Sequence, residues 1–187
     1  MEKDKNKFMV LFVCTGNSCR SPMAEGILKK LLKENKLNNF EVVSAGTSSM
    51  DGAFASLFAM EVAKAQNVDL TQHRTRQLNR EILREADLIL AMSDAHLEAI
   101  RRMDEKALEK TYPLKTFPRH YPISSSEGGL SETKNEDKRQ GVSYIRDPIG
   151  GSIDDYNQCF LEIEKEIKRI FPDLISLAGE KNLKDHF

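Results

Sequence analysis

The sequence predicts an α/β protein, a three-layer sandwich in which a central parallel four-stranded sheet carries helices on both faces. Two observations lead to this prediction. Short uninterrupted apolar runs, such as FMVLFV at 8–13, alternate along the chain with segments whose apolar residues recur at helical spacing. Strands of this kind are buried on both faces, which requires a helical layer on each side of the sheet. The 187 residues fit one domain, 1–187.

The first half of the chain supplies two strands and two helices. The strand at Phe8–Val13 is followed by a loop and by a helix with Ser21 as its N-cap and Pro22 in its first turn. A second strand is predicted at Phe40–Val43. The apolar residues that mark the second helix are Phe54, Leu57, Phe58 and Val62.

The second half supplies two strands and two helices. A buried strand is predicted at Ala86–Met92, with Ser93 as the cap of the next helix, and a fourth strand at Leu114–Phe117. Residues 121–146 are rich in Ser, Gly and charged side chains, which predicts a long surface loop inserted in the domain. A capping-box pattern at 152–155 precedes an amphipathic helix. The apolar stripe of that helix is Tyr156, Phe160, Ile163, Ile167 and Ile170.

Composition narrows the classes of partner. The chain is 40% hydrophobic and 30% charged, as expected of a folded globular domain. Its net charge of −1 gives no electrostatic footprint for nucleic acid or anionic lipid, and no apolar stretch is long enough for a transmembrane helix. The apolar run near the start lacks the cleavage site of a signal peptide, so we predict a cytoplasmic protein. The oligomeric state stays open.

The loop after the first strand, CTGNSCRSP at 14–22, carries the predicted chemistry. Ligands of parallel sheets bind at the carboxyl ends of the strands, and this loop lies between a strand and a helix. A loop that wraps an oxyanion must point successive backbone N–H groups inward, and Gly16 and Asn17 tolerate the left-handed conformations that this requires. The positive end of the following helix points at the same place. We therefore predict a phosphate site.

The side chains of this loop suit hydrolysis of a phosphorylated substrate. Arg20 can bind two phosphate oxygens with its planar guanidinium. The positive field favours the thiolate of Cys14, which is the predicted nucleophile. Ser21 can donate a hydrogen bond to that thiolate. The further phosphate-binding residues predicted in the loop are Thr15, Gly16, Asn17, Ser18 and Cys19.

The three cysteines favour neither a disulfide framework nor a metal site. Their odd number argues against a set of structural disulfides, and Cys14 and Cys19 lack the further Cys or His pair that would complete four zinc ligands. We predict no cofactor, because a thiolate and loop amides can do the work that a metal does elsewhere. Cys159 lies in the last predicted helix and is expected to be a core residue.

The sequence resembles the low-molecular-weight protein tyrosine phosphatases and their bacterial phosphoarginine-phosphatase relatives. The matching segments occur in the family's order, and outside them the stretch at 121–146 is longer than usual. The resemblance implies hydrolysis of phosphorylated proteins through a phosphocysteine intermediate. The segments are VCTGNSCRSPMAEG at 13–26, SAG at 44–46, HRTRQL at 73–78, ADLILAM at 86–92 and DPIGGSIDDY at 147–156.

The resemblance also implies residue roles: Cys14 as nucleophile, Arg20 as phosphate clamp and Asp147 as general acid. Chemistry supports Asp147, because a leaving phenolate or guanidine needs a proton and the resulting carboxylate can then activate water. The residues implied to brace the loop by hydrogen bonds are Asn17, Ser44 and His73.

Two positions bear on the substrate. Ser18 is small where the tyrosine phosphatases tend to carry a bulky aliphatic residue, and Ile149 stands where they tend to carry an aromatic one. The chain therefore offers no aromatic wall there for a phenol ring. GGSID at 150–154 matches the phosphoarginine phosphatases, whereas Ile149 departs from both groups. The pocket leans towards phosphoarginine, and phosphotyrosine stays open.

Two other functions are weighed. Thioredoxin-coupled arsenate reductases share this fold but relay a disulfide through cysteines just after the third strand, where LAMSDAHLEAI has none. Pro22 also departs from those reductases. A catalytically silent phosphoprotein-binding module would be expected to lack Cys14, Arg20 or Asp147, and all three are present.

Cys19 suggests a hypothesis about regulation. It lies in the same loop as Cys14 and could form a reversible disulfide with it under peroxide, which would protect the nucleophile from over-oxidation. The alternative is that Cys19 only packs.

Overall fold

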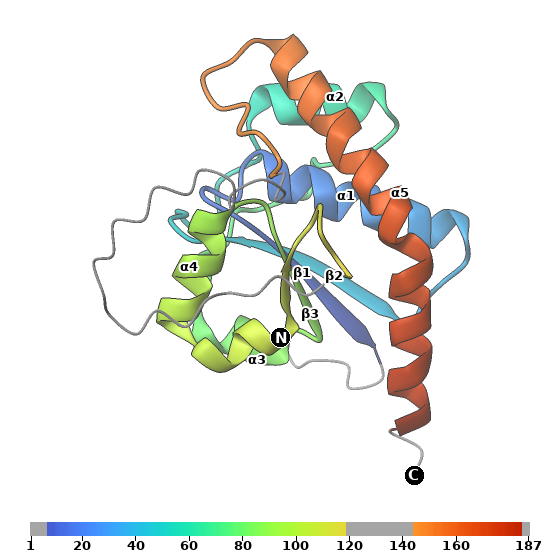
Figure 1. Ribbon diagram of the computed structural model, residues 1–187. Helices are drawn as coiled ribbons and strands as arrows, with labels where there is room; N and C mark the ends of the chain where they lie inside the picture. The colour runs from blue at the N-terminus through green and yellow to red at the C-terminus, as the bar shows by residue number, and fades with distance from the viewer. Residues whose placement is uncertain (1–6, 119–143, 185–187) are drawn as a thin grey trace, which may run out of the picture.

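The structure, a computed structural model, describes residues 7–118 and 144–184. It contains the predicted α/β sandwich, with a four-stranded parallel sheet between two layers of helices (Figure 1). The strand order is β2-β1-β3-β4, so β1 is an inner strand, and it is buried along its whole length. The strands are β1 (Phe8–Cys14), β2 (Phe40–Gly46), β3 (Leu88–Ala91) and β4 (Thr111–Pro113).

The apolar run of β1 serves both helical layers. Val10 and Phe12 belong to the core on one face of the sheet, whereas Met9, Leu11 and Val13 belong to the core on the other. Successive side chains of a strand point to opposite faces, so burial on both sides requires a continuous apolar sequence.

The prediction for the fourth strand is wrong. β4 ends at Pro113 and pairs with β3 over three residues, and the predicted strand at Leu114–Phe117 is a turn instead. Leu114 and Phe117 are buried all the same, at 1% and 2% exposure. Their apolar character reflects burial in a turn, which a short sequence run does not distinguish from burial in a strand.

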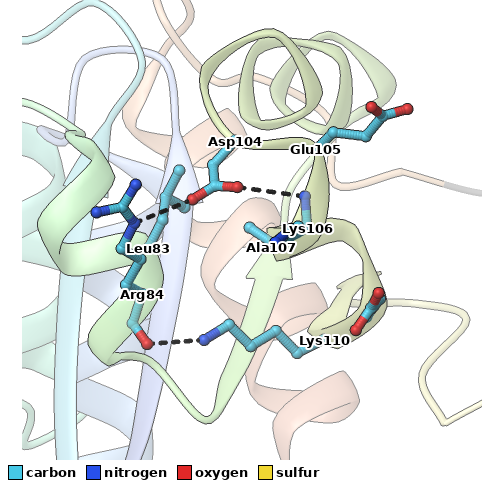
Figure 2. Close-up of a pocket in the computed structure, with 8 residues that line it drawn as sticks. Leu83, Arg84, Asp104, Glu105, Lys106, Ala107 and Lys110 are labelled. Atoms are coloured by element: carbon cyan, nitrogen blue, oxygen red, sulfur yellow. Dashed lines mark hydrogen bonds and ion pairs between the residues drawn. The ribbon is translucent and has the colours of Figure 1, made fainter.

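One face of the sheet is covered by short elements. There α3 and η1 lie on either side of a surface hollow, across which Arg84 Nε is 3.4 Å from Asp104 Oδ2 (Figure 2). Lys110 Nζ donates to the carbonyl of Arg84 at 2.9 Å. The six-residue helix α3 was not predicted, because it is too short to show a helical period. The elements are α3 (Arg80–Glu85), α4 (Asp94–Met103) and the 3₁₀-helix η1 (Glu105–Lys110).

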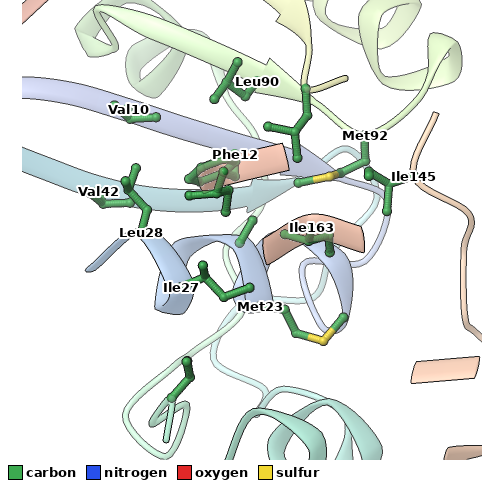
Figure 3. Close-up of a cluster of buried hydrophobic side chains, with 14 of the residues drawn as sticks. Val10, Phe12, Met23, Ile27, Leu28, Val42, Leu90, Met92, Ile145 and Ile163 are labelled. Carbon is green, nitrogen blue, oxygen red and sulfur yellow. The ribbon is translucent and has the colours of Figure 1, made fainter. Parts of the chain in front are cut away.

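The other face carries the two longest helices, α1 (Arg20–Glu34) and α5 (Ile153–Lys184), together with α2 (Leu57–Ala65) and the larger core. Met23 and Leu28 of the first helix pack with Phe12 of β1 and Ile163 of the last helix, and each is fully buried (Figure 3). Truncating one of these side chains to Ala would cost about 2–5 kcal/mol. This core fixes the end of β1 and the start of the next helix, and so both ends of the loop between them.

Three helix starts differ in how well they were predicted. α2 begins at Leu57, with Ser56 as its N-cap, so Phe54 lies before the helix and is 57% exposed. Ser93 occupies the N-cap position of α4, but its hydroxyl bonds His96 Nδ1 rather than a helix amide. The capping box before α5 is confirmed by bonds at 2.8 Å from the Ser152 amide and hydroxyl to Asp155 Oδ2. The predicted stripe of α5 is buried.

Most of the predicted loop at 121–146 lies outside the described residues, which resume at Tyr144. Among the described helices, none combines the length and apolar character needed to cross a bilayer.

Candidate active site

The loop from Cys14 to Arg20 turns its carbonyl groups outward. Every carbonyl from Cys14 to Ser18 accepts a hydrogen bond from a segment outside the loop. The amides of residues 15–19 donate none within the part of the chain that the structure describes. Since the N–H and C=O of a peptide unit point in opposite directions, these amides are available to an anion inside the loop. The five outer donors, at 2.8–3.1 Å, are Thr47 N, Ser48 N, Ser49 Oγ, His73 Nε2 and Ser56 N.

Gly46, in the SAG segment at 44–46, allows the chain at the end of β2 to come close enough to bond the loop carbonyls. A Cβ at this position would lie 2.5 Å from the Thr15 carbonyl oxygen and 2.9 Å from the Asn17 amide nitrogen. Neither backbone atom can move without distorting the loop. A glycine is needed here because the end of β2 approaches the loop backbone closely.

Asn17 is the central side chain of the loop and is fully buried. Its φ is +53°, so the predicted left-handed conformation is present here, whereas the same prediction for Gly16 is wrong. The side-chain nitrogen of Asn17, Nδ2, donates to Ser21 Oγ at 2.9 Å and to Ser44 Oγ at 2.8 Å. The side-chain oxygen, Oδ1, accepts from the backbone amide of Arg76 at 2.8 Å. One side chain therefore joins the loop to α1, β2 and the segment after α2.

Cys14 ends β1 and is 2% exposed, with Sγ 3.0 Å from Ser21 Oγ. The N-cap prediction for Ser21 is wrong, because α1 already begins at Arg20 and Ser21 lies in its first turn. Ser21 Oγ accepts from Asn17, and a thiolate has no proton to give. When Cys14 is a thiolate, the Ser21 hydroxyl hydrogen is therefore the one that points at it, which stabilises the negative charge on sulfur.

Arg20 and Asp147 meet, although 127 residues separate them. The Arg20 side chain is buried, and its Nη2 forms an ion pair with the Asp147 carboxylate, whose side chain is 37% exposed. Arg20 Nη1 donates to the Ile145 carbonyl at 3.4 Å. Arg20 Nε is buried and has no partner within the described residues. An unpaired buried donor is costly, and an oxyanion held by the loop amides would satisfy it.

The segment that carries Asp147 is tied to the chain around it. On the α5 side, the Arg146 carbonyl is 3.6 Å from Cys159 Sγ, and Arg146 Nη1 is 3.9 Å from Asp155 Oδ1. Ile145 is buried beside Met92, to whose carbonyl its amide donates at 3.2 Å (Figure 3). The hydroxyl of Tyr144 donates to the Asp94 carboxylate on α4. Beyond Asp147 the segment is open, with Ile149 72% exposed.

Three residues beside the loop were not predicted from the sequence. Glu25 accepts from Ser44 Oγ at 2.5 Å and lies 3.9 Å from His73 Nδ1. His96 Nε2 is 3.0 Å from Thr15 Oγ1. Tyr156 OH is 3.4 Å from Cys19 Sγ. Glu25 is four residues after Ser21 on α1, and that helical spacing was the one available signal.

Burial dominates the titration of three groups near the site. It raises the pKa of Tyr156 to about 12, with the Cys19 hydrogen bond as the next cause. It also raises the pKa of Cys159 to about 12, and this thiol lies in the core as predicted. Burial, and next the charge of Arg20, lower the pKa of His96 to about 4. All three are therefore neutral near pH 7.

The cysteines of the loop point to different partners. Cys14 contacts Ser21, whereas Cys19 Sγ lies 3.3 Å from Ser56 Oγ, at the start of α2, and near Tyr156 of α5. Both thiols are free, and the Cys14–Cys19 disulfide stays a prediction. Within the described residues, His, Cys, Asp and Glu side chains form no group of three or more that could hold a metal ion.

Comparisons with known proteins agree with one another. A family model described as low molecular weight phosphotyrosine protein phosphatase matches residues 9–128. The protein-arginine-phosphatase of Geobacillus stearothermophilus is 34% identical over 163 residues, which cover 87% of this chain and 93% of that relative. The low molecular weight protein-tyrosine-phosphatase PtpB of Staphylococcus haemolyticus is 33% identical over 158 residues, covering 82% and 91%.

The fold comparison gives a similar result. The solved structure of the YwlE arginine phosphatase from Geobacillus stearothermophilus superposes with a TM-score of 0.72 at 34% identity. The match covers 92% of this chain and 96% of that one. The likeness therefore extends over nearly all of both chains.

Proposed function

The chain belongs to the low molecular weight phosphotyrosine protein phosphatase family, and we propose that it hydrolyses phosphorylated proteins through a phosphocysteine formed on Cys14. Family membership makes it a cysteine-dependent phosphoprotein phosphatase. The observation that carries the residue assignment is a loop whose amides at 15–19 donate to no group in residues 7–118 and 144–184, beside the buried Nε of Arg20, which has no partner in those residues either. The cytoplasmic location stays a prediction from the sequence.

In the first step the phosphoryl group of the substrate enters the loop. The amides and the Arg20 guanidinium bind its oxygens, which releases Asp147 from its ion pair with Arg20. The Cys14 sulfur then bonds to phosphorus while the bond from phosphorus to the substrate oxygen or nitrogen breaks. Asp147 takes up a proton from solvent once it has left Arg20 and lies beside the phosphate, and it gives that proton to the leaving atom.

In the second step a water molecule attacks the phosphorus of the phosphocysteine. The Asp147 carboxylate takes the proton from that water, the sulfur–phosphorus bond breaks and inorganic phosphate leaves. Ser21 donates its hydrogen bond to the departing Cys14 thiolate, at the geometry already present in the structure. Residues 15–19 serve this chemistry through their amides.

The substrate class that we propose is phosphoarginine on proteins, with phosphotyrosine as the second candidate. Ser18 is small, and the exposed Ile149 gives no aromatic wall beside Asp147 for a phenol ring. The relative from Geobacillus stearothermophilus, named as a protein-arginine-phosphatase, supports the first candidate. PtpB of Staphylococcus haemolyticus, named as a protein-tyrosine-phosphatase, supports phosphotyrosine as the second candidate.

The test is steady-state hydrolysis of matched phosphoarginine and phosphotyrosine peptides in EDTA. Wild type should turn over one or both, Cys14→Ser neither, and the ratio of kcat/KM values should favour phosphoarginine. Cys159→Ala is the matched control for loss of a thiol: it removes a buried cysteine of α5 whose Sγ lies 3.6 Å from the Arg146 carbonyl, so turnover should fall far less than in Cys14→Ser. Equal activity of Cys14→Ser and wild type would show that the nucleophile is assigned wrongly.

A further inference from the structure

The first turn of α4 contacts the phosphate loop through His96. This side chain is 2% exposed and bonds two hydroxyls, with Nε2 3.0 Å from Thr15 Oγ1 and Nδ1 3.0 Å from Ser93 Oγ. Thr15 is the residue directly after the nucleophile. The proposed reaction gives His96 no role, yet its two ring nitrogens connect Thr15 of the loop to Ser93 at the start of α4.

The same end of the sheet also contacts the segment that carries the general acid. The carbonyl of Met92 accepts from the Ile145 amide, and the Asp94 carboxylate accepts from the Tyr144 hydroxyl. The Met92 amide in turn donates to the Val13 carbonyl at 3.1 Å, one residue before Cys14. Residues 92–96 therefore lie between the nucleophile and the acid and are bonded to the chain on both sides.

We propose that His96 is a positioning residue. As an uncharged imidazole it holds Thr15, and with it the first amide of the phosphate loop, in a fixed position relative to the acid segment. The inference rests on the proposed function, because it assigns His96 a part in that reaction. Amides that bind a developing charge are effective only when held in place before the reaction.

The surroundings of His96 keep it uncharged. A second positive charge beside Arg20 in a buried site would be unfavourable, and the low pKa of His96 agrees with this. A neutral imidazole has one donor and one acceptor nitrogen, and the two hydroxyls satisfy both. Removing only the Thr15 contact should free that side chain and lower kcat more than it changes KM, since the loss is felt most in the transition state.

A matched pair of variants separates the two contacts. The amide of Gln can take the place of Nε2, so His96→Gln keeps the Thr15 contact. The amide of Asn can take the place of Nδ1, so His96→Asn keeps only the Ser93 contact. With p-nitrophenyl phosphate as the probe, kcat should fall about tenfold in His96→Asn and less than about threefold in His96→Gln, with KM changed less than about threefold.

Thr15→Val, which changes an exposed side chain, completes a double-mutant cycle and does not depend on how well the His96 variants fold. It should lower kcat about as much as His96→Asn, and the double variant should lose no more than either single one. Thermal unfolding of each variant serves as the folding control. Equal losses in His96→Gln and His96→Asn, an unchanged kcat in Thr15→Val, or losses that multiply in the double variant would overturn the inference.

Cys14→Ser, assayed alongside, separates this failure from failure of the proposed function. If Cys14→Ser is inactive and the two His96 variants behave alike, only the positioning role fails. If Cys14→Ser turns over p-nitrophenyl phosphate as wild type does, the proposed function itself fails.

Discussion

The phosphate loop at 14–20 and the acid segment at 144–151 meet at one ion pair but are held in opposite ways. The loop is buried at both ends, and its outward carbonyls are bonded to three other segments. The acid segment is tied to its neighbours through Tyr144, Ile145 and Arg146, yet it leaves the Asp147 side chain 37% exposed. The comparison indicates that phosphate binding is built into the fold before the substrate arrives, whereas proton delivery depends on a side chain that can move.

At the Arg20–Asp147 ion pair, a bound phosphate can replace the Asp147 carboxylate on the Arg20 guanidinium. In the structure Asp147 occupies Nη2 of Arg20, while Nε has no partner among the residues that the structure describes. A phosphate would compete for the same guanidinium and so release the acid towards the leaving group. Changes in the loop should therefore affect stability and activity together, whereas changes in the acid segment should affect activity alone.

The largest expected effect is on Asn17. Asn17→Ala removes three side-chain hydrogen bonds from a buried site and places alanine at φ +53°, so the free energy of unfolding should fall by about 3–4 kcal/mol. Asn17→Gly tolerates that φ and should recover roughly 1 kcal/mol of the loss. Urea titration measures both. A loss in Asn17→Ala no larger than about 0.5 kcal/mol would remove the distinction between the two regions.

The next effect concerns Asp147, where stability and activity should separate. Asp147→Asn should lower kcat about 100-fold for a phosphopeptide, because its leaving group needs a proton. With p-nitrophenyl phosphate, whose leaving group is stable as an anion, the first chemical step should slow much less. Rapid-mixing measurement of p-nitrophenol release, with urea titration as the control, tests this. An equal slowing of that step for both substrates would argue against Asp147 as the acid.

The smallest effect is the pH dependence of stability that His96 contributes. Its pKa falls from the ordinary 6.5 to about 4 in the folded chain, so protonation favours the unfolded chain. The contribution is complete above pH 6.5 and is lost as the pH falls towards 4. Between pH 7 and pH 5 wild type should lose on the order of 2 kcal/mol more than His96→Gln, which cannot titrate there. Denaturation curves of both proteins at pH 7 and pH 5 measure the two losses of unfolding free energy. Equal losses in wild type and His96→Gln would contradict the prediction.

The parts that could be predicted from the sequence are those in which neighbouring residues carry the signal. The phosphate loop is one contiguous motif between an apolar strand and an amphipathic helix, and the capping box before α5 spans four residues. β4 and α3 have three and six residues, too few to show a period, and Leu114 and Phe117 are buried without being in a strand. Short elements of this kind depend on tertiary packing for their existence.

The supporting contacts of the site were harder to predict, because they join residues that are distant in the sequence. His96 and Thr15 are 81 residues apart, and Tyr156 and Cys19 are 137 apart. His96 lies outside the matching segments, and Tyr156, the last residue of DPIGGSIDDY, was predicted only as part of the apolar stripe of α5. The displacement of the α1 N-cap from Ser21 to Cys19 also has a tertiary cause, since Ser21 contacts Cys14 and Asn17 instead of capping the helix.

The most direct test of the central claim is to trap the covalent intermediate. Asp147→Asn should accumulate it, because the attack of water on the phosphocysteine then lacks its base. The variant is mixed with p-nitrophenyl phosphate, quenched in acid within the first turnovers and mapped by peptide mass spectrometry. We expect one phosphoryl group on the sulfur of Cys14. A phosphoryl group on any other residue, or an unmodified Cys14 while p-nitrophenol is still released in a burst, would contradict it.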